Sequence, residues 1–284
     1  MSAAACLAAA ALSAGTFGRV VPIGGHAADI ALDERRQVLY IANFTANRVE
    51  VMSTADLSIQ RSINTAPQPG SIALSRDGRF LVVGHFSNFQ PPATPNHVLT
   101  ILNLETNTRQ TLTFSAAVLG VAFGVDGRAL IVTATEFVVL DPAAGTTVRV
   151  GTLAEVAKTL PVAPGQFPPN ILAASVTATG DGRLIFGLTD LFQFVYVVDQ
   201  GAIVATRYIA TPTLGPRLVT PNEDGSIVAF GWAVGHFLGG SSVYQFANVS
   251  GALNLGTHAI DSPAGIMYAQ VPESGPPPPL PAQG

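Results

Sequence analysis

One segment pattern recurs five times along the chain, and this repetition limits the possible folds more than any other feature. Asp29–Phe44 (DIALDERRQVLYIANF) aligns with Ser71–Phe86 (SIALSRDGRFLVVGHF) at an offset of 42 residues. Both contain Ile-Ala-Leu, then a polar turn, then a β-rich run that ends in Phe. Related segments begin at Gly120, Ser175 and Arg217. Repetition at such a period indicates one supersecondary unit that is stacked several times.

The turn inside each unit points to a tight β-hairpin. The first unit uses Asp33–Arg36, whereas the other four carry an Asp-Gly pair: Asp77-Gly78, Asp126-Gly127, Asp181-Gly182 and Asp224-Gly225. An Asp-Gly pair supplies the positive φ that a short hairpin turn needs. The sequence therefore predicts that strands A and B of every unit are joined by this turn.

Two further strands follow each hairpin. In the first unit they are Arg48–Met52 and Leu57–Ile63. Four short strands per repeat are typical of propeller blades, and a period of 3.6 residues, which helical repeats would show, is missing. We predict an all-β fold over residues 16–271, a β-propeller of four-stranded antiparallel blades with five near-complete blades and an incomplete closing blade.

Composition excludes several classes of protein. Apolar residues make up 48% of the chain and charged residues 11%, against roughly 25% charged in an average domain. The net charge is −4, and the 14 basic residues are scattered except for Arg35-Arg36. Nucleic acid is therefore not an expected partner. The single cysteine, Cys6, excludes both a disulfide framework and a cysteine-based zinc site.

Residues 1–15, MSAAACLAAAALSAG, form an apolar run of signal-peptide length. Ser13-Ala14-Gly15 offers a small-residue cleavage site, although no Lys or Arg precedes Arg19. A disordered or packed N-terminal tail is the alternative, and a lipid-anchored Cys6 fits less well. The run is too short to span a bilayer, so we predict no transmembrane span. The preferred interpretation is an exported protein that is periplasmic, extracellular or on the cell surface.

The first two units resemble a known repeat. Leu39–Asn43 and Asn47–Val51 resemble the YVTN-type β-propeller repeat, in which Tyr-Val-Thr-Asn closes strand B and Asn-x-Val-x-Val forms strand C. Pro69–Arg79 resembles the first half of the same repeat, and the likeness extends over Thr16–Gln270 while weakening after the second unit. Membership implies a propeller. Because such propellers include surface-layer-like proteins, lactonases and electron-transfer enzymes, the resemblance leaves the function open.

The two ends of the repeat region suggest how the ring closes. Arg19–His26 aligns with Arg61–Gln68, so Phe17–Ile23 is expected as an outer strand D. Pro263–Val271 is expected as strand A of the closing blade, whose strands B and C are missing. We expect an incomplete chain, or a blade completed by a partner chain; an open or five-bladed ring is the alternative. Residues 272–284 are Pro-rich, favour polyproline II, and suit a tail or a linker to a further domain.

Three long connections are expected on one face of the propeller. In a blade, the B–C and D–A connections share one face, and the A–B and C–D connections share the other. Residues 87–96 and 235–240 are interpreted as B–C loops and 151–169 as a D–A connection, with one or two helical turns near residue 153. Long loops on a rigid scaffold are where function is concentrated, although tolerated drift is the alternative. The candidate binding residues on this face are His26, Phe89, Gln90, Asn96, His97, Asn170, Arg217, His236 and Phe237.

The sequence contains no catalytic motif. Its five histidines lack the spacing of metal ligands, and His85, which replaces Asn43 in the repeat, is expected to bond to backbone at a strand end. The inner strands begin with apolar or small residues, apart from Asn170 and Arg217. We therefore predict no catalytic residue, no metal and no cofactor.

These observations leave two main hypotheses for function. The first is a non-catalytic binding scaffold that recognises a protein or a glycan through the B–C and D–A loop face. The alternative is a propeller enzyme, a lactonase-like hydrolase or a dehydrogenase-like protein, with its site at the channel mouth and with His26, Arg217 and Asn170 in that site. A purely structural cell-surface repeat is a third class.

Overall fold

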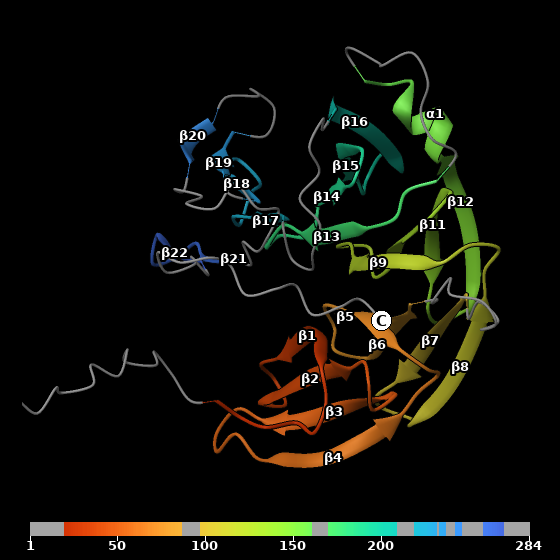
Figure 1. Ribbon diagram of the computed structural model, residues 1–284, viewed down its shortest axis with the longest axis vertical. Coiled ribbons are helices and arrows are strands. Elements are labelled where there is room, and N and C mark those ends of the chain that lie inside the picture. The colour runs from red at the N-terminus through yellow and green to blue at the C-terminus, as the bar shows by residue number, and fades with distance from the viewer. Residues whose placement is uncertain are drawn as a thin grey trace, which may run out of the picture.

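The computed structural model describes residues 20–86, 97–160, 170–208, 219–231, 233–236, 242–245 and 258–269. Within these ranges the strands form six antiparallel sheets, five of four strands and one of two. Figure 1 shows the sheets arranged around a common centre, each with its first strand innermost. The predicted all-β propeller with five four-stranded blades is confirmed.

The first three blades follow one plan, with strands in sequence order from the centre outward. Their bounds are, for blade 1, β1 Ala27–Asp33, β2 Val38–Asn43, β3 Arg48–Ser53 and β4 Ile59–Asn64; for blade 2, β5 Pro69–Leu74, β6 Phe80–His85, β7 Val98–Asn103 and β8 Thr108–Thr113; for blade 3, β9 Val118–Phe123, β10 Ala129–Thr133, β11 Glu136–Asp141 and β12 Thr146–Thr152.

The remaining sheets continue the ring, and the inner strands β1, β5, β9, β13, β17 and β21 contact one another in that order. Their bounds are, for blade 4, β13 Ala174–Ala178, β14 Leu184–Thr189, β15 Phe192–Val197 and β16 Ala202–Tyr208; for blade 5, β17 Val219–Pro221, β18 Val228–Phe230, β19 Ala233–Gly235 and β20 Ser242–Gln245; for the closing sheet, β21 His258–Asp261 and β22 Ile266–Ala269.

The core lies between blades, in separate apolar clusters. Each middle strand is covered on both faces, so β6 (FLVVGH) is buried along its whole length. Neighbouring blades also approach closely: a Cβ on Gly84 would lie 2.6 Å from Val118 Cγ1 of the next blade. This two-sided burial explains why the chain carries so many apolar and so few charged residues.

The predicted A–B turns are confirmed. The glycines of the four Asp-Gly pairs have φ of 69°, 77°, 73° and 76° at residues 78, 127, 182 and 225. The Asp77 carboxylate accepts hydrogen bonds from the Arg79 amide at 3.0 Å and the Ser75 hydroxyl at 2.6 Å. The aspartate thereby fixes the loop while the glycine supplies the left-handed backbone.

Blade 5 differs from its predicted strand order. The segment after the B–C loop predicted at 235–240, Ser242–Phe246, was expected as strand C, but β18 and β19 form a short hairpin and β20 is the fourth strand. The connection at 236–241 is therefore a C–D connection. The prediction was wrong because β18 and β19 have three residues each. So short a strand does not show the alternation of apolar and polar residues by which strands are recognised.

The closing sheet also corrects a prediction. Pro263–Val271 was expected as strand A with no B strand, whereas His258–Asp261 is the inner strand and Ile266–Ala269 pairs with it antiparallel. Of the expected outer strand Phe17–Ile23, the structure describes Val20–Ile23, and these residues lie outside the strands.

Helical structure is minor in the described chain. The helical turn expected near residue 153 is confirmed as α1, Leu153–Ala157, whose capping box joins Thr152 and Glu155. Among the described residues, no helix is long and apolar enough to cross a membrane.

Candidate functional site

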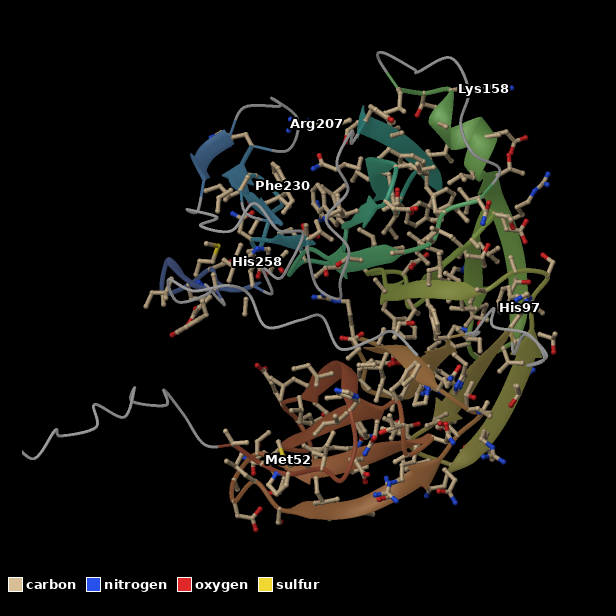
Figure 2. All side chains as sticks on the ribbon, in the orientation of Figure 1. Met52, His97, Lys158, Arg207, Phe230 and His258 are labelled. Carbon is tan, nitrogen blue, oxygen red and sulfur yellow. The ribbon has the colours of Figure 1, made fainter. Side chains whose placement is uncertain are left out.

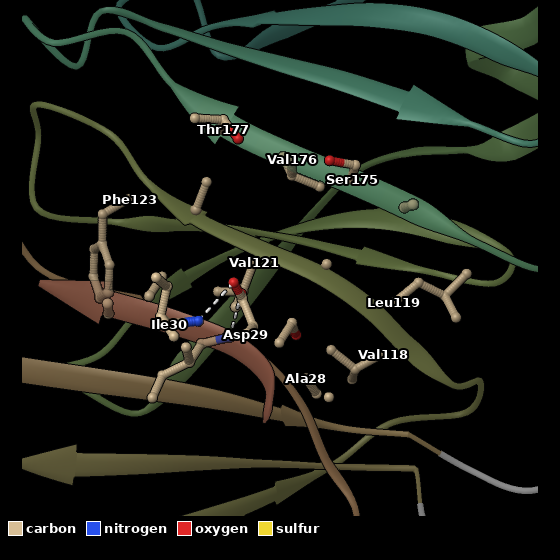
Figure 3. A pocket seen from close by; sticks show the side chains of 18 of the residues that line it. Ala28, Asp29, Ile30, Val118, Leu119, Val121, Phe123, Ser175, Val176 and Thr177 are labelled. Atoms are coloured by element: carbon tan, nitrogen blue, oxygen red, sulfur yellow. Dashed lines mark hydrogen bonds between the residues drawn. The ribbon is translucent and has the colours of Figure 1, made fainter. Parts of the chain in front are cut away.

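The inner strands of blades 1 to 4 line an open cavity of about 650 Å³ near the centre of the ring. Figure 3 shows the side chains of β1, β9 and β13 that turn toward it. Most of the lining is aliphatic or backbone, and the contributing strands are β1, β5, β9 and β13, with Phe44, Gly70, Arg76, Phe86, Leu172 and Ala173 at their ends. The cavity can therefore accept apolar groups far more readily than ions.

One carboxylate lines the described part of this cavity, and it joins two blades. Asp29 Oδ1 accepts a hydrogen bond from the Ile30 amide at 2.8 Å, and Oδ2 accepts one from the Ile72 amide of blade 2 at 3.0 Å. Both bonds are drawn in Figure 3. Ser175 makes the equivalent contact with the Val219 amide of blade 5 at 3.4 Å. Asp29 therefore acts as an inter-blade tie.

The two ends of the cavity differ, and the A–B end carries a cation. Arg76, in the A–B turn of blade 2, donates from Nη1 to the Gly180 carbonyl of blade 4 at 2.6 Å. The Val125 amide of blade 3 donates to the Gly182 carbonyl of the same turn at 2.7 Å. These bonds bring the turns of three blades together, so the A–B end is partly covered.

The opposite end, on the face of the B–C and D–A connections, is apolar. Phe44 and Phe86 each follow a strand B, and their amides donate to the carbonyls of His26 and Gln68, both at 2.8 Å. These bonds hold the two half-buried rings beside the inner strands with centroids 6.1 Å apart. We call the side chains of Phe44, Phe86, Leu119 and Leu172 the apolar mouth.

Leu172 is the most exposed member of the apolar mouth, with 65% of its surface accessible. Its amide donates to both carboxylate oxygens of Asp190, at 3.0 and 3.1 Å. Asp190 follows β14 as Phe86 follows β6, so the two residues are equivalent in the repeat. In blade 4 this residue holds the backbone of Leu172, and in blade 2 it supplies an aromatic ring. An exposed leucine fixed by a side chain in this way is a prepared apolar contact.

Two of the predicted site residues are close in sequence to residues that line this mouth, although neither lines the cavity itself. His26 immediately precedes the lining residue Ala27, and Asn170 lies two residues before Leu172. Both are exposed and come from opposite parts of the ring, blade 1 and the connection into blade 4. Five others, Phe89, Gln90, Asn96, Arg217 and Phe237, lie outside the described residues.

The other two predicted residues are not brought to the mouth. His97 precedes β7, a third strand, and Figure 2 shows it at the outer rim of the ring. His236 follows β19, and its Nδ1 lies 3.0 Å from the Ser226 carbonyl of an A–B turn. The prediction that all three long connections share one face is therefore wrong for His236, which lies on the A–B face.

The buried histidines have structural environments. His85 is fully buried, with Nδ1 3.0 Å from the Pro67 carbonyl and Nε2 2.9 Å from the Thr100 hydroxyl, which confirms the predicted strand-end role. Because a carbonyl only accepts, Nδ1 carries the hydrogen and Nε2 accepts from Thr100. Burial lowers the pKa of His85 to about 4. Burial also lowers the pKa of His258, near the centre of the ring in Figure 2.

Within the described residues, no three His, Cys, Asp or Glu side chains converge as metal ligands would. The apolar mouth was not recognised from the sequence, although the repeat alignment ended in Phe at both 44 and 86. Its signal was present in those two aromatic residues, which follow strand B where most blades carry a smaller or polar residue.

Comparisons with known proteins support the fold. No family model and no curated protein matches the chain. Hydrazine synthase from Kuenenia stuttgartiensis is similar in structure, with 16% identity and a TM-score of 0.55 over 78% of this chain and 58% of that chain. The β-propeller domain of Myceliophteria thermophila Cps50 (Swd1) has 14% identity and a TM-score of 0.52 over 75% and 62%. Each match spans less than two thirds of the other chain, and at such identities the likeness shows the fold alone.

Proposed function

We propose that this chain is a YVTN-type propeller that acts as a non-catalytic binding module and takes up an extended apolar segment of a partner protein at the apolar mouth. The observation that carries the proposal is the mouth itself. It combines two half-buried aromatic rings 6.1 Å apart with an exposed leucine, above a cavity of about 650 Å³. Concave apolar sites on rigid strands are typical binding sites.

The chemistry of the lining favours a peptide over a glycan. A sugar site needs several polar side chains that converge on hydroxyl groups, whereas the described lining is mainly Ala, Val, Ile, Leu and Phe. An apolar peptide side chain gains free energy on burial there without leaving polar groups unpaired. The long connection 87–96, which follows β6 and Phe86, leaves from the same face.

The hydrogen bonds of the carboxylate in the cavity lining favour a binding site over a catalytic site. A hydrolase or dehydrogenase at this mouth would draw on His26 and Asn170, with Arg217 outside the described residues. It would also need a general base, a role that would fall to His26 or Asp29. Asp29, the carboxylate in the described lining, accepts backbone hydrogen bonds on both oxygens, an arrangement that favours a fixed tie.

Selection of ligands by the intact chain tests the proposal. The wild-type protein would be panned against a random peptide library and a glycan array, in parallel with Leu172→Asp and Val148→Asp. Leu172 and Val148 are 65% and 69% exposed, so both variants place a carboxylate on the surface at little cost in stability. Val148 lies on the outer strand β12, away from the cavity.

We expect peptides with apolar residues to bind the wild type and Val148→Asp, and to bind Leu172→Asp at least about tenfold more weakly. Equal binding by all three proteins would contradict the proposal. If the protein selected glycans and no peptide, the partner would be a carbohydrate and not a protein.

We also propose that residues 1–15 form a signal peptide and that the protein is exported, which rests on the apolar composition of that run. N-terminal sequencing of the protein from its source cells should begin near Thr16. A start at the first residues would contradict export by this route.

A further inference from the structure

We propose that the apolar mouth is also the docking site for the proline-rich tail of the same chain, Pro276–Pro281, so that the tail competes with outside partners. This inference rests on the proposed function, because it assigns an occupant to the same mouth. The tail sequence PPPPLP contains the P-x-x-P spacing at Pro278 and Pro281. It lies outside the described residues, and the last described residue before it is Ala269.

The described chain leaves the propeller on the face that carries the mouth. In β22, Ala269 pairs with His258, the first residue of the inner strand β21. Strand B of each blade ends where strand A begins, and Phe44 and Phe86 follow β2 and β6 at the same level. Ala269 is therefore equivalent to Asn43 and His85, the residues that directly precede Phe44 and Phe86.

The connection between Ala269 and the proline run is longer than the spacing between two neighbouring strands. From Ala269 to Pro276 the chain has seven residues, which span roughly 20 Å when extended at ~3.1 Å per residue. Strand β22 is adjacent to the inner strand β21, at a spacing of roughly 5 Å. A segment of this length extends from the end of β22 past the inner strand β21, toward the axis that the mouth surrounds.

The chemistry of the two partners is complementary. A polyproline II segment has a preformed backbone, loses little entropy on docking, and is recognised by grooves lined with aromatic rings. Phe44 and Phe86 supply such rings, and Leu172 supplies an apolar wall for Leu280. Each proline offers a carbonyl but no amide, so the groove must provide donors. His26, which is exposed and directly precedes β1, carries a ring N–H that can act as such a donor.

Photo-crosslinking in the intact chain tests this inference. p-Benzoylphenylalanine would replace Leu280 in the full-length protein, and the irradiated sites would be mapped by mass spectrometry. We expect crosslinks to peptides that contain Phe44, Phe86 or Leu172, within a single chain. Loss of these crosslinks is expected when Pro278, Pro279 and Pro281 are replaced by Ala, a change outside the described strands that leaves the blades intact. Val148→Asp should keep them.

The same tail variant gives a second measurement. A library peptide selected at the mouth should bind the proline-to-alanine variant several times more tightly than the wild type, because the internal competitor is lost. Crosslinks to other surfaces, crosslinks between two chains, or unchanged peptide affinity would each overturn the tail assignment. Those results would leave the mouth as a peptide site, whereas a failure of the proposed function would appear as peptide binding that ignores Leu172→Asp.

Discussion

At the residue scale, the last position of strand B holds different polar residues in different blades. Four blades carry a buried polar residue there, and each bonds to nearby groups: Asn43, His85, Thr133 and Thr189. Asn43 and His85 both donate to a carbonyl of the segment before strand A, Ile23 and Pro67 respectively. In blades 1 and 2 the side chain thus ties the end of strand B to the start of its blade, whereas the two threonines donate to the first carbonyl of strand C, that of Glu136 or Phe192.

His85 should make stability depend on pH. The folded protein keeps the imidazole neutral down to its pKa of about 4, while the unfolded chain binds a proton near 6.5. Between these values the unfolded state binds more protons, so stability rises with pH and is lost as the pH falls from 6.5 to 4. The full difference is worth about 3 kcal/mol. Urea unfolding at a series of pH values measures this loss.

His85→Asn provides the matched control, because blade 1 already has Asn43 at this position. The variant should fold. Between pH 6.5 and 4 its free energy of unfolding should fall less steeply than that of the wild type, because unfolding of the variant no longer takes up the proton that His85 binds. An unchanged pH profile would show that His85 is protonated in the folded state and that the assigned hydrogen-bond pattern is wrong.

At the element scale, the A–B turns do more than reverse the chain. Arg36 Nη1 of blade 1 donates to the Gly78 carbonyl of blade 2 at 2.7 Å, and the Asp181 amide of blade 4 donates to the Glu223 carbonyl of blade 5 at 3.3 Å. Each turn therefore contacts a later one. The Asp-Gly pair keeps the loop short enough for these contacts to form.

Gly127→Ala isolates the cost of the backbone conformation. Gly127 has φ of 77°, and an added Cβ would meet no heavy atom within 4 Å. The free energy of unfolding should fall by about 1 kcal/mol from the left-handed backbone alone. Gly127→Asn should lose less, because Asn tolerates this region. Denaturant titration of both variants checks the order, and an alanine as stable as glycine would contradict the turn geometry.

The sequence predicted elements well where the repeat was regular. Blades 1 to 4 agree with the expected strands because strands B and C are buried on both faces and a recognisable turn, an Asp-Gly pair in blades 2 to 4, joins strands A and B. The prediction was wrong in blade 5, where three-residue strands left no period, and in the closing sheet, where Pro263-Ala264-Gly265 proved to be the turn and not the strand. Short strands owe their pairing to neighbouring blades, which a local pattern does not reveal.

At the scale of the whole molecule, the ring sets apart two unlike faces. Arg76 and the A–B turns cover one end of the axial cavity, whereas Phe44, Phe86, Leu119 and Leu172 surround the other. The sequence did indicate the face of the mouth, through His26 and Asn170. It did not reveal the mouth itself, because residues from blades 1 to 4 meet there only after the ring forms. His97 lies at the B–C end of β7 as expected, although at the outer rim of the ring. His236 was placed on the wrong face because the short strands of blade 5 concealed their order.

The most direct test of the central claim, that the apolar mouth is the binding surface, is the affinity of one selected peptide for three proteins. Isothermal titration calorimetry would compare the wild type, Phe86→Ala and Val148→Asp, with circular dichroism as the check on folding. We predict a dissociation constant at least about tenfold higher for Phe86→Ala and an unchanged one for Val148→Asp. Equal affinity for the wild type and a folded Phe86→Ala would contradict the account.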